Sequence, residues 1–488
     1  MRIKVLIAAA AALFAIACGS EDKGGAPDEC NPLGGPACLM PWPSSAYLED
    51  DPSAATGVRL ALPAEAMPVN IDGVAIKPDY FNRFDGYSVS GPMLVDFETG
   101  VSADGLPHHT DPGASLRPDS PVVVINMDTG DRVILFAEPD LNGKEPENQT
   151  LIIRPLDRLQ SASRYVVAVR KSVKAADGGE IPVPEAFQRL VDGKSLNHPL
   201  GERVEGEYPE IFQVLEDAGI PRDDLLMAWS FKTASDDYLF GDLLAMRSQA
   251  YEMMGPTAEG FEFDVEVLSN GNPEEVRHFL AGTYDVPMFL TDGESDTSIL
   301  DRDGAGVPVA NGKARAKWAA IVPRCVETQP LPRPAILFGH GIFGNALDSL
   351  DYSFLQQIAE DNCVVVIGGD WIGLTNRQFA AVAFAMNDIN RGLSLTEKLH
   401  QGLINFIALG RVARHQFANA PELQFEGQAI IDPNNVQYFG ASLGGILGNV
   451  FMAFDQDIER GALGVPGGPW TLLFERSTYW PPLRITMQ

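Results

Sequence analysis

The chain has 488 residues, and a single hydrophobic core stops growing at roughly 250 to 300 residues, so two or three domains are expected. A hydrophobic content of 45% with 21% charged residues excludes a mainly disordered chain. The formal net charge of -30 excludes a nucleic-acid partner and repels anionic lipid head groups, so membrane attachment would need an anchor.

The first segment, residues 1–17, has the pattern of an export signal. A short basic start precedes an apolar stretch that ends at Ala17 and is too short to span a bilayer. Cys18 follows small residues, which predicts cleavage before it and lipidation of its thiol; ordinary secretory cleavage after Ala17 is the alternative. Residues 18–30 read as a polar tether. With Gly19 next to the cysteine, the pattern resembles lipoproteins sorted to the outer membrane, so we expect an exported protein of the cell envelope.

Four further cysteines permit three pairings. Cys30 and Cys38 flank a stretch rich in Gly and Pro, where a local disulfide would hold a loop that has no helix or strand. Cys325 follows one expected strand and Cys363 opens another. A bridge between these two and a pair of buried free thiols are both open.

Residues 31–234 are expected to form a β-rich domain. Alternating apolar residues bounded by turn residues predict a hairpin that pairs 121–127 with 132–138. The same pattern predicts two further strands, at 149–155 and 164–170. Strands at this spacing favour a sandwich-like domain. The stretch PLDRLQSASRYVVAVR resembles the end of bacterial Ig-like surface modules.

Two helices are predicted after these strands. The first covers residues 205–220. The second covers 235–255 and links the two halves of the chain: Ser235 is a suitable cap, and Gly255 followed by proline ends the helix.

From residue 256 to 488 the pattern changes to buried strands that alternate with helices. The expected strands are 261–268, 284–291, 314–323, 334–340, 363–370 and 435–441. A long helix from Ser394 carries Glu397 at capping-box spacing. Nearly continuous apolar strands separated by helices predict a mostly parallel sheet covered on both faces. Ligands of such sheets bind at the carboxyl ends of the strands.

The stretch Gly440-Ala441-Ser442-Leu443-Gly444 follows one of these strands and precedes a helix. It matches the G-x-S-x-G pattern, in which a serine sits on a strained turn between a strand and a helix. Residues two places away on either side must be small, because larger side chains would collide with the strand or the helix. Ser442 is therefore the predicted nucleophile.

A second motif, FGHGIFG, follows the first central strand about a hundred residues upstream. With the serine turn it makes residues 256–488 resemble α/β-hydrolases, and His340-Gly341 resembles the HG turn of bacterial lipases. The resemblance implies that the backbone amides of Ile342 and Leu443 form an oxyanion hole. The alternative is that Gly341 and Gly344 only permit a tight turn.

The chain combines a lipoprotein signal, a β-rich N-terminal half with PWPSSAY (41–47) and DGYS (85–88), and a C-terminal hydrolase pattern. This combination resembles the bacterial virulence-factor lipase group, which includes outer-membrane lysophospholipase lipoproteins. This resemblance implies an ester or lipid substrate. Phe343 and Trp371 lie near the predicted site and are candidates for an acyl pocket, or they pack in the core. Residues 301–306 match only the start of a calcium loop, so neither a metal nor a cofactor is predicted. No protein partner is indicated.

The acid and the histidine that would complete a catalytic triad with Ser442 are not evident in the sequence. In this fold the acid and then the histidine follow the serine, but no histidine follows Ser442. Only one further strand, 461–467, can be recognised. We therefore expect a C-terminally truncated hydrolase whose triad acid and histidine lie beyond residue 488, and which is nearly inactive by itself. The alternative is a non-catalytic surface lipoprotein with a binding or adhesion role on a hydrolase-like scaffold.

Overall fold

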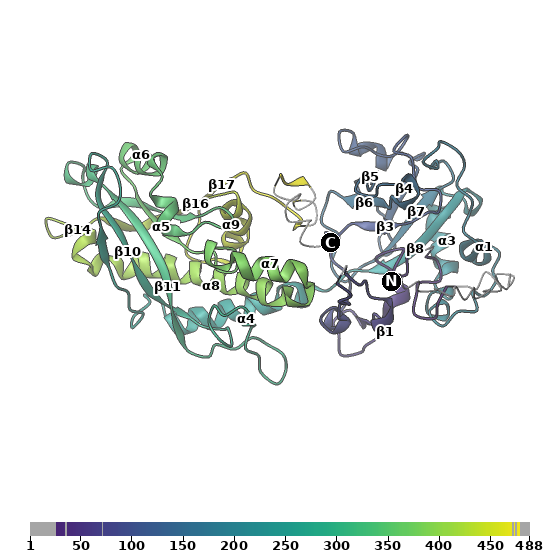
Figure 1. The fold of residues 1–488 in the computed structure, drawn as a ribbon, viewed down its shortest axis with the longest axis horizontal. Coiled ribbons are helices and arrows are strands. Elements are labelled where there is room, and N and C mark those ends of the chain that lie inside the picture. The colour runs from purple at the N-terminus through teal and green to yellow at the C-terminus, as the bar shows by residue number, and fades with distance from the viewer. Residues whose placement is uncertain (1–25, 35–36, 71, 471–472, 474–475, 479–488) are drawn as a thin grey trace, which may run out of the picture.

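The computed structural model describes residues 26–34, 37–70, 72–470, 473 and 476–478. Residues 1–17 and Cys18 lie outside the described residues. The described chain forms two lobes, each with its own hydrophobic core (Figure 1). The first core runs from Leu33 to Phe231, and the second from Leu243 to Ile458. Among the described residues, no helix combines the length and the hydrophobicity needed to cross a bilayer.

The N-terminal lobe contains two three-stranded antiparallel sheets and a small two-stranded ribbon. The first sheet has the order β3 (Met93–Val95), β6 (Leu151–Pro155), β5 (Leu135–Pro139). The second has the order β4 (Val122–Asn126), β7 (Arg164–Arg170), β8 (Leu225–Lys232). The ribbon pairs β1 (Leu48–Asp50) with β2 (Val58–Leu60). Both larger sheets contribute to the first core, while the Ig-like assignment stays a prediction.

The predicted hairpin at 121–138 is wrong beyond its turn. The amide of Asn126 donates to Asp131 O at 2.9 Å, and that of Val133 donates to Val124 O at 2.9 Å. Beyond this point β4 and β5 enter different sheets, because β4 pairs with β7 and β5 pairs with β6.

In the described part of the N-terminal lobe the α-helices are α1 (Glu185–Val191), α2 (Gly201–Glu205) and α3 (Tyr208–Asp217). α1 and α3 pack against β8, and Phe187, Tyr208 and Ile211 enter the core. The predicted helix at 205–220 corresponds to α3.

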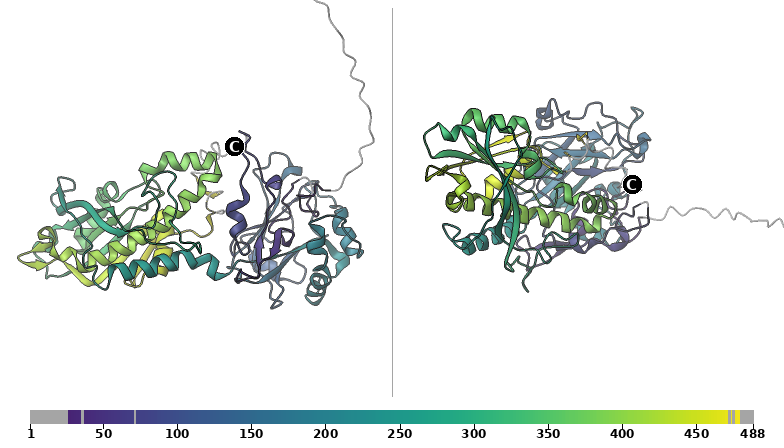
Figure 2. Two further views of the ribbon diagram at one scale, coloured as in Figure 1. Left: turned by 90° about the horizontal axis from the view of Figure 1, so that it is seen from below. Right: turned by 60° about the vertical axis from the view of Figure 1, so that its left-hand side comes forward.

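The predicted linking helix is α4 (Asp236–Met254). The Ser235 hydroxyl accepts a hydrogen bond from the amide of Tyr238 at 3.1 Å, and Gly255 ends the helix with a φ of 61°. The buried side chains of α4 belong to the second core. α4 therefore packs as part of the C-terminal lobe, beside α8 (Gly392–His415) (Figures 1 and 2).

The C-terminal lobe is built on a seven-stranded mixed sheet in the order β17-β16-β12-β13-β11-β10-β9. Its strands are β9 (Glu266–Leu268), β10 (Val276–Pro287), β11 (Lys313–Pro323), β12 (Arg333–Gly339), β13 (Val365–Gly369), β16 (Ile431–Ala441) and β17 (Gly461–Gly464). A separate ribbon pairs β14 (Gln424–Phe425) with β15 (Gln428–Ala429). β13, β12, β16 and β17 run parallel, and the other strands are antiparallel. Gly339 pairs in register with Gly369 and Gly440, so three parallel strands end side by side.

Helices lie on both faces of this sheet. On one face, α5 (Ala346–Leu350) and α6 (Ser353–Asn362) cover a small separate core. On the other face, α8 and α9 (Leu443–Phe454) share the main core with α4. α7 (Phe379–Asn387) precedes α8 and packs against it. This mixed sheet with helices on both faces is consistent with the predicted hydrolase fold.

The predicted capping box of the long helix is wrong. α8 begins at Gly392, and the Ser394 hydroxyl donates to Arg391 O at 2.9 Å. Glu397 is buried and pairs with Arg302 at 2.6 Å. The Glu397 carboxylate therefore forms an ion pair with a distant segment, and it does not cap the helix as the local spacing had predicted.

Both candidate cysteine pairs are bonded in the structure. The Cys30–Cys38 disulfide closes a loop with a sequence separation of 8, and the Cys325–Cys363 disulfide one with a separation of 38. The second bridge ties the chain just after β11 to the chain just before β13. It therefore encloses β12 and the FGHGIFG turn.

Candidate active site

Ser442 stands at the turn between β16 and α9. Its φ of 56° and ψ of -120° lie in a region that residues other than glycine rarely adopt. The Ser442 amide donates to Gly464 O at 3.1 Å, and its carbonyl accepts from Gly445 at 2.8 Å. The serine side chain is exposed, whereas Leu443 behind it is buried. The turn thus presents one hydroxyl to solvent at the carboxyl end of a central strand.

Glycines at 440 and 444 are required by the packing of this turn. A Cβ at Gly440 would lie 2.3 Å from Gly444 O, and one at Gly444 would lie 2.0 Å from Gly339 O. Both contacts are far inside the closest approach of real atoms and involve backbone oxygens. The serine turn therefore packs directly against the end of β12.

The FGHGIFG turn lies beside Ser442. A Cβ at Gly341 would be 3.7 Å from the Ser442 Cβ and 3.9 Å from its Oγ. The amide of Phe343 donates to Leu374 O at 2.8 Å. Among the described residues, no acceptor bonds the amide of Ile342 or of Leu443. These two amides, from the turns on either side of the hydroxyl, are the pair that the sequence had assigned to the oxyanion hole.

His340 holds this turn in place and does not face the serine. Its Nδ1 donates to Gly341 O at 2.7 Å, and its Nε2 accepts from the Trp371 amide at 2.9 Å. Burial lowers the pKa of the ring, which keeps the imidazole neutral and able to make both bonds. Because both ring nitrogens are used, His340 cannot also accept a proton from Ser442.

Trp371 was a candidate for an acyl pocket, and the structure places it in the core instead. Its side chain is fully buried and stacks on Phe406, with ring centroids 3.7 Å apart. Below the serine turn, the Tyr438 hydroxyl donates to Gly444 O at 2.5 Å. Tyr438 was not assigned a role from the sequence, yet it supports the turn from beneath.

Phe343, the other candidate for an acyl pocket or for core packing, follows Ile342 in the FGHGIFG turn. Its φ of 55° is positive, and its ring meets that of Phe379 edge-on with centroids 4.9 Å apart. Phe379 and Phe384 of α7 are 54% and 59% exposed. An apolar rim therefore borders the turn that carries Ile342.

An ion-pair network beside the site was not foreseen. Asp370 directly follows β13, is buried, and accepts a hydrogen bond from the Ala346 amide at 2.8 Å. It pairs with Arg377 at 2.6 Å, and Arg377 also pairs with Glu294 at 2.7 Å. Its sequence signal was an acidic residue at the end of a central parallel strand.

No histidine is positioned to activate Ser442. All seven histidines lie in the described residues, and none is hydrogen-bonded to its hydroxyl; they are His108, His109, His198, His278, His340, His400 and His415. Two of the acids after the serine are engaged elsewhere. Asp455 accepts from the Tyr251 hydroxyl at 2.8 Å, and Asp457 pairs with Arg411 at 2.8 Å.

Asp455 nevertheless links stability to pH. Burial raises its pKa to about 6, although the hydrogen bond from Tyr251 acts in the opposite direction. A folded-state pKa above the unfolded value of about 3.9 means that folding favours the protonated form. This contribution to stability is present in full below the unfolded pKa and is lost as pH rises through about 6.

Asp455→Asn is therefore expected to flatten the pH dependence of the free energy of unfolding of the C-terminal lobe. As the pH rises from the unfolded to the folded pKa of Asp455, the native protein should lose roughly 2 to 3 kcal/mol of unfolding free energy because of this carboxyl group. The variant should not lose it. Urea denaturation at a series of pH values measures the difference. Parallel pH profiles for the two proteins would contradict the perturbed carboxyl.

Comparison with family models of protein sequences finds no match. No curated protein matches the chain either. Similar solved structures include acetyl xylan esterase 1 from Thermoanaerobacterium sp. JW/SL YS485, with 14% identity and a TM-score of 0.31. An acetyl xylan esterase from Paenibacillus sp. R4 has 14% identity and a TM-score of 0.27. The juvenile hormone esterase from Manduca sexta has 15% identity and a TM-score of 0.23.

The matches cover 51%, 51% and 42% of this chain, which spans 66%, 72% and 41% of those three proteins. These neighbours are esterases by name. Because the identities and TM-scores are low, the chemistry proposed below rests on the geometry of this chain alone.

Proposed function

We propose that the C-terminal lobe is a serine carboxylic-ester hydrolase domain with Ser442 as the nucleophile. The observation that carries this proposal is the pairing of an exposed serine at positive φ with the amides of Ile342 and Leu443, which lie on adjoining turns and bond no acceptor within the described part of the chain. A strained serine turn of this kind is costly, and such strain gathers at functional sites. A structural turn would not require the hydroxyl to face solvent.

The chemistry follows from this arrangement. The Ser442 oxygen forms a bond to the ester carbonyl carbon, and the carbonyl electrons move onto oxygen as the hydroxyl proton leaves. The amides of Ile342 and Leu443 then stabilise the oxyanion; losing one such donor typically costs about 10²- to 10³-fold in rate. Collapse of the intermediate expels the alcohol, which takes up the proton, and water later releases the acid from the serine.

A base must accept the proton of the Ser442 hydroxyl. We propose that this base, and the acid that orients it, lie outside the described residues. Both ring nitrogens of His340 are engaged, and among the described residues no other histidine is hydrogen-bonded to the Ser442 hydroxyl. An enzyme of this kind without its base loses on the order of 10⁶ in turnover. The described chain is accordingly proposed to be nearly inactive by itself.

A fluorophosphonate probe tests the nucleophile. Labelling is expected on Ser442 in a chain extended to contain the proposed base and acid, and it should be absent when that chain carries Ser442→Ala. Ser53→Ala, a change at an exposed serine of the other lobe, should retain full labelling of the extended chain. Peptide mass spectrometry locates the label. Equal labelling of the Ser442→Ala protein would contradict the assignment of Ser442 as the nucleophile.

Sequencing of the coding DNA past codon 488 tests the source of the base. An in-frame aspartate followed by a histidine supports the enzyme. A stop codon at that point, verified by intact mass, favours the second candidate: a non-catalytic surface lipoprotein that uses this lobe as a scaffold. The engagement of both His340 nitrogens is the observation in favour of that candidate.

We further propose that the protein is exported and anchored to the outer membrane through a lipid on Cys18. The apolar stretch before this residue and the small residues beside it support the proposal. Cys18→Ser is expected to release the protein from the membrane fraction. Unchanged fractionation of this variant would remove the anchor from the proposal.

A further inference from the structure

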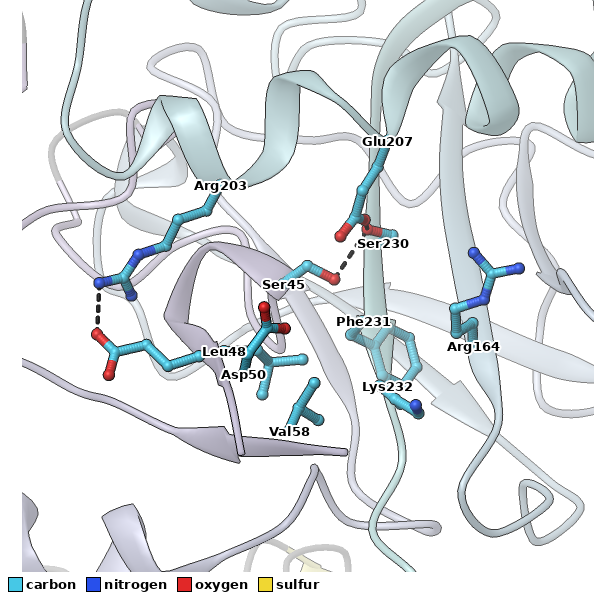
Figure 3. A pocket seen from close by; sticks show the side chains of 11 residues that line it. Ser45, Leu48, Asp50, Val58, Arg164, Arg203, Glu207, Ser230, Phe231 and Lys232 are labelled. Carbon is cyan, nitrogen blue, oxygen red and sulfur yellow. Dashed lines mark hydrogen bonds and ion pairs between the residues drawn. The ribbon is translucent and has the colours of Figure 1, made fainter. Parts of the chain in front are cut away.

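A cavity of about 370 Å³ lies in the N-terminal lobe, and none of its lining residues belongs to the C-terminal lobe. It is bordered by a single helical turn, η1 (Ser45–Tyr47), by the β1–β2 ribbon, by the residue before α3 and by the end of β8 (Figure 3). Nothing in the proposed esterase chemistry uses this cavity. Its volume is in the range of sites for small molecules.

Two carboxylates that form no ion pair among the described residues face this space, although the charge of Arg164 acts on Glu207 from a distance. Glu207 accepts a hydrogen bond from the Ser230 hydroxyl, which is also 2.9 Å from the hydroxyl of Ser45. Among the described residues, neither Glu207 nor Asp50 forms an ion pair. Burial raises the pKa of Glu207, although its bond with Ser230 acts in the opposite direction. Both carboxylates point toward the cavity (Figure 3), so a bound cation would relieve an unfavourable charge.

Two of the three cations around the cavity are already paired. Arg164 bonds Glu210 at 2.7 Å, and Arg203 bonds Glu49 at 2.6 Å. Lys232 differs, because its ammonium donates to a backbone carbonyl at 2.6 Å and has no ion pair among the described residues. One positive charge therefore stays uncompensated, opposite the two acids in Figure 3.

We propose that this cavity binds a small zwitterion of the α-amino acid class with an apolar side chain. The ligand ammonium would lie between Glu207 and Asp50, and its carboxylate would meet Lys232. Leu48 and Val58, both partly exposed at the cavity, would contact the side chain. Each unpaired charge then gains a partner of opposite sign.

Other ligand classes fit less well. A simple anion would meet Glu207 and Asp50 and would be repelled by a surface of net charge -30. A simple cation would leave Lys232 unpaired. Among the described residues, no group of three or more His, Cys, Asp or Glu side chains could hold a metal ion. A zwitterion carries no net charge, so its approach is not opposed.

Isothermal titration of the purified protein with L-leucine tests the proposal. Leucine is expected to bind at least about tenfold more tightly than N-acetyl-L-leucine, which lacks the ammonium, or 3-methylbutylamine, which lacks the carboxylate. Equal affinity for leucine and N-acetyl-leucine would remove the role of the acids. An absence of any heat with millimolar leucine would overturn the site.

Variants separate the two charged ends. Glu207→Gln and Lys232→Met should each weaken leucine binding at least about tenfold, whereas Lys232→Arg and the exposed control Lys144→Met should not. Should Glu207→Gln fail to fold, Asp50→Asn changes an exposed carboxylate of the same cavity and should weaken binding as well. Undiminished binding in both charge-removing variants contradicts the proposal.

Discussion

Replacing Gly444 with alanine is expected to lower the free energy of unfolding of the C-terminal lobe by at least about 3 kcal/mol. The new Cβ would lie 2.0 Å from Gly339 O and 2.5 Å from the Gly339 carbonyl carbon. These are backbone atoms of β12, a central strand, so no side-chain rotation can relieve the clash. The serine turn and β12 would have to separate, which would break the contact that positions Ser442 beside Gly341.

Gly241→Ala is the matched control. Its Cβ would meet no described atom within 4 Å. Because Gly241 lies inside α4, alanine there should raise stability by about 0.5 to 1 kcal/mol. Urea denaturation with hydrogen exchange of peptides from β12 and β16 measures both changes, and peptides from the N-terminal lobe serve as an internal reference. A loss below about 1 kcal/mol for Gly444→Ala would contradict the packing described here.

The serine turn was predictable because its determinants are local. The steric demands of a strand, a tight turn and a helix act over five residues, and Gly440 and Gly444 meet them. The parallel strands were also recognisable from their continuous apolar runs. The role of the Ile342 amide could be expected from its motif. The bond from the neighbouring Phe343 amide to Leu374 O could not, because Leu374 belongs to a later loop of the chain.

The errors have a shared physical origin in contacts between distant segments. The turn after Asn126 formed as expected, yet β4 and β5 part because their other partners, β7 and β6, arrive later in the chain. β8 was missed although it is buried along almost its whole length, because its place in the sheet comes from its pairing with β7, which lies far back in the chain. Stacking on Phe406 decides the place of Trp371, and nothing in the local sequence reports it.

Removing the Cys325–Cys363 disulfide by a double change to alanine is expected to lower the free energy of unfolding by roughly 4 kcal/mol. The bridge closes a loop with a sequence separation of 38, and a longer closed loop restricts the unfolded chain more. In the folded protein, the Cys325 amide still donates to the Glu360 carboxylate at 2.8 Å. The native arrangement therefore keeps a second link between the same segments.

The Cys30–Cys38 bridge provides the comparison. This bridge closes a loop with a sequence separation of 8. Removing the bridge should therefore lower the free energy of unfolding of the N-terminal lobe by roughly 2.5 kcal/mol. Hydrogen exchange under urea resolves the lobes. The Cys325–Cys363 variant should expose β12 and β13 first and leave β7 protected. Because that loop contains the turn that carries Ile342, its loosening should also slow fluorophosphonate labelling of Ser442 in the extended chain, an effect that loss of the Cys30–Cys38 bridge should not produce. Equal losses from the two bridges would contradict the loop-length argument.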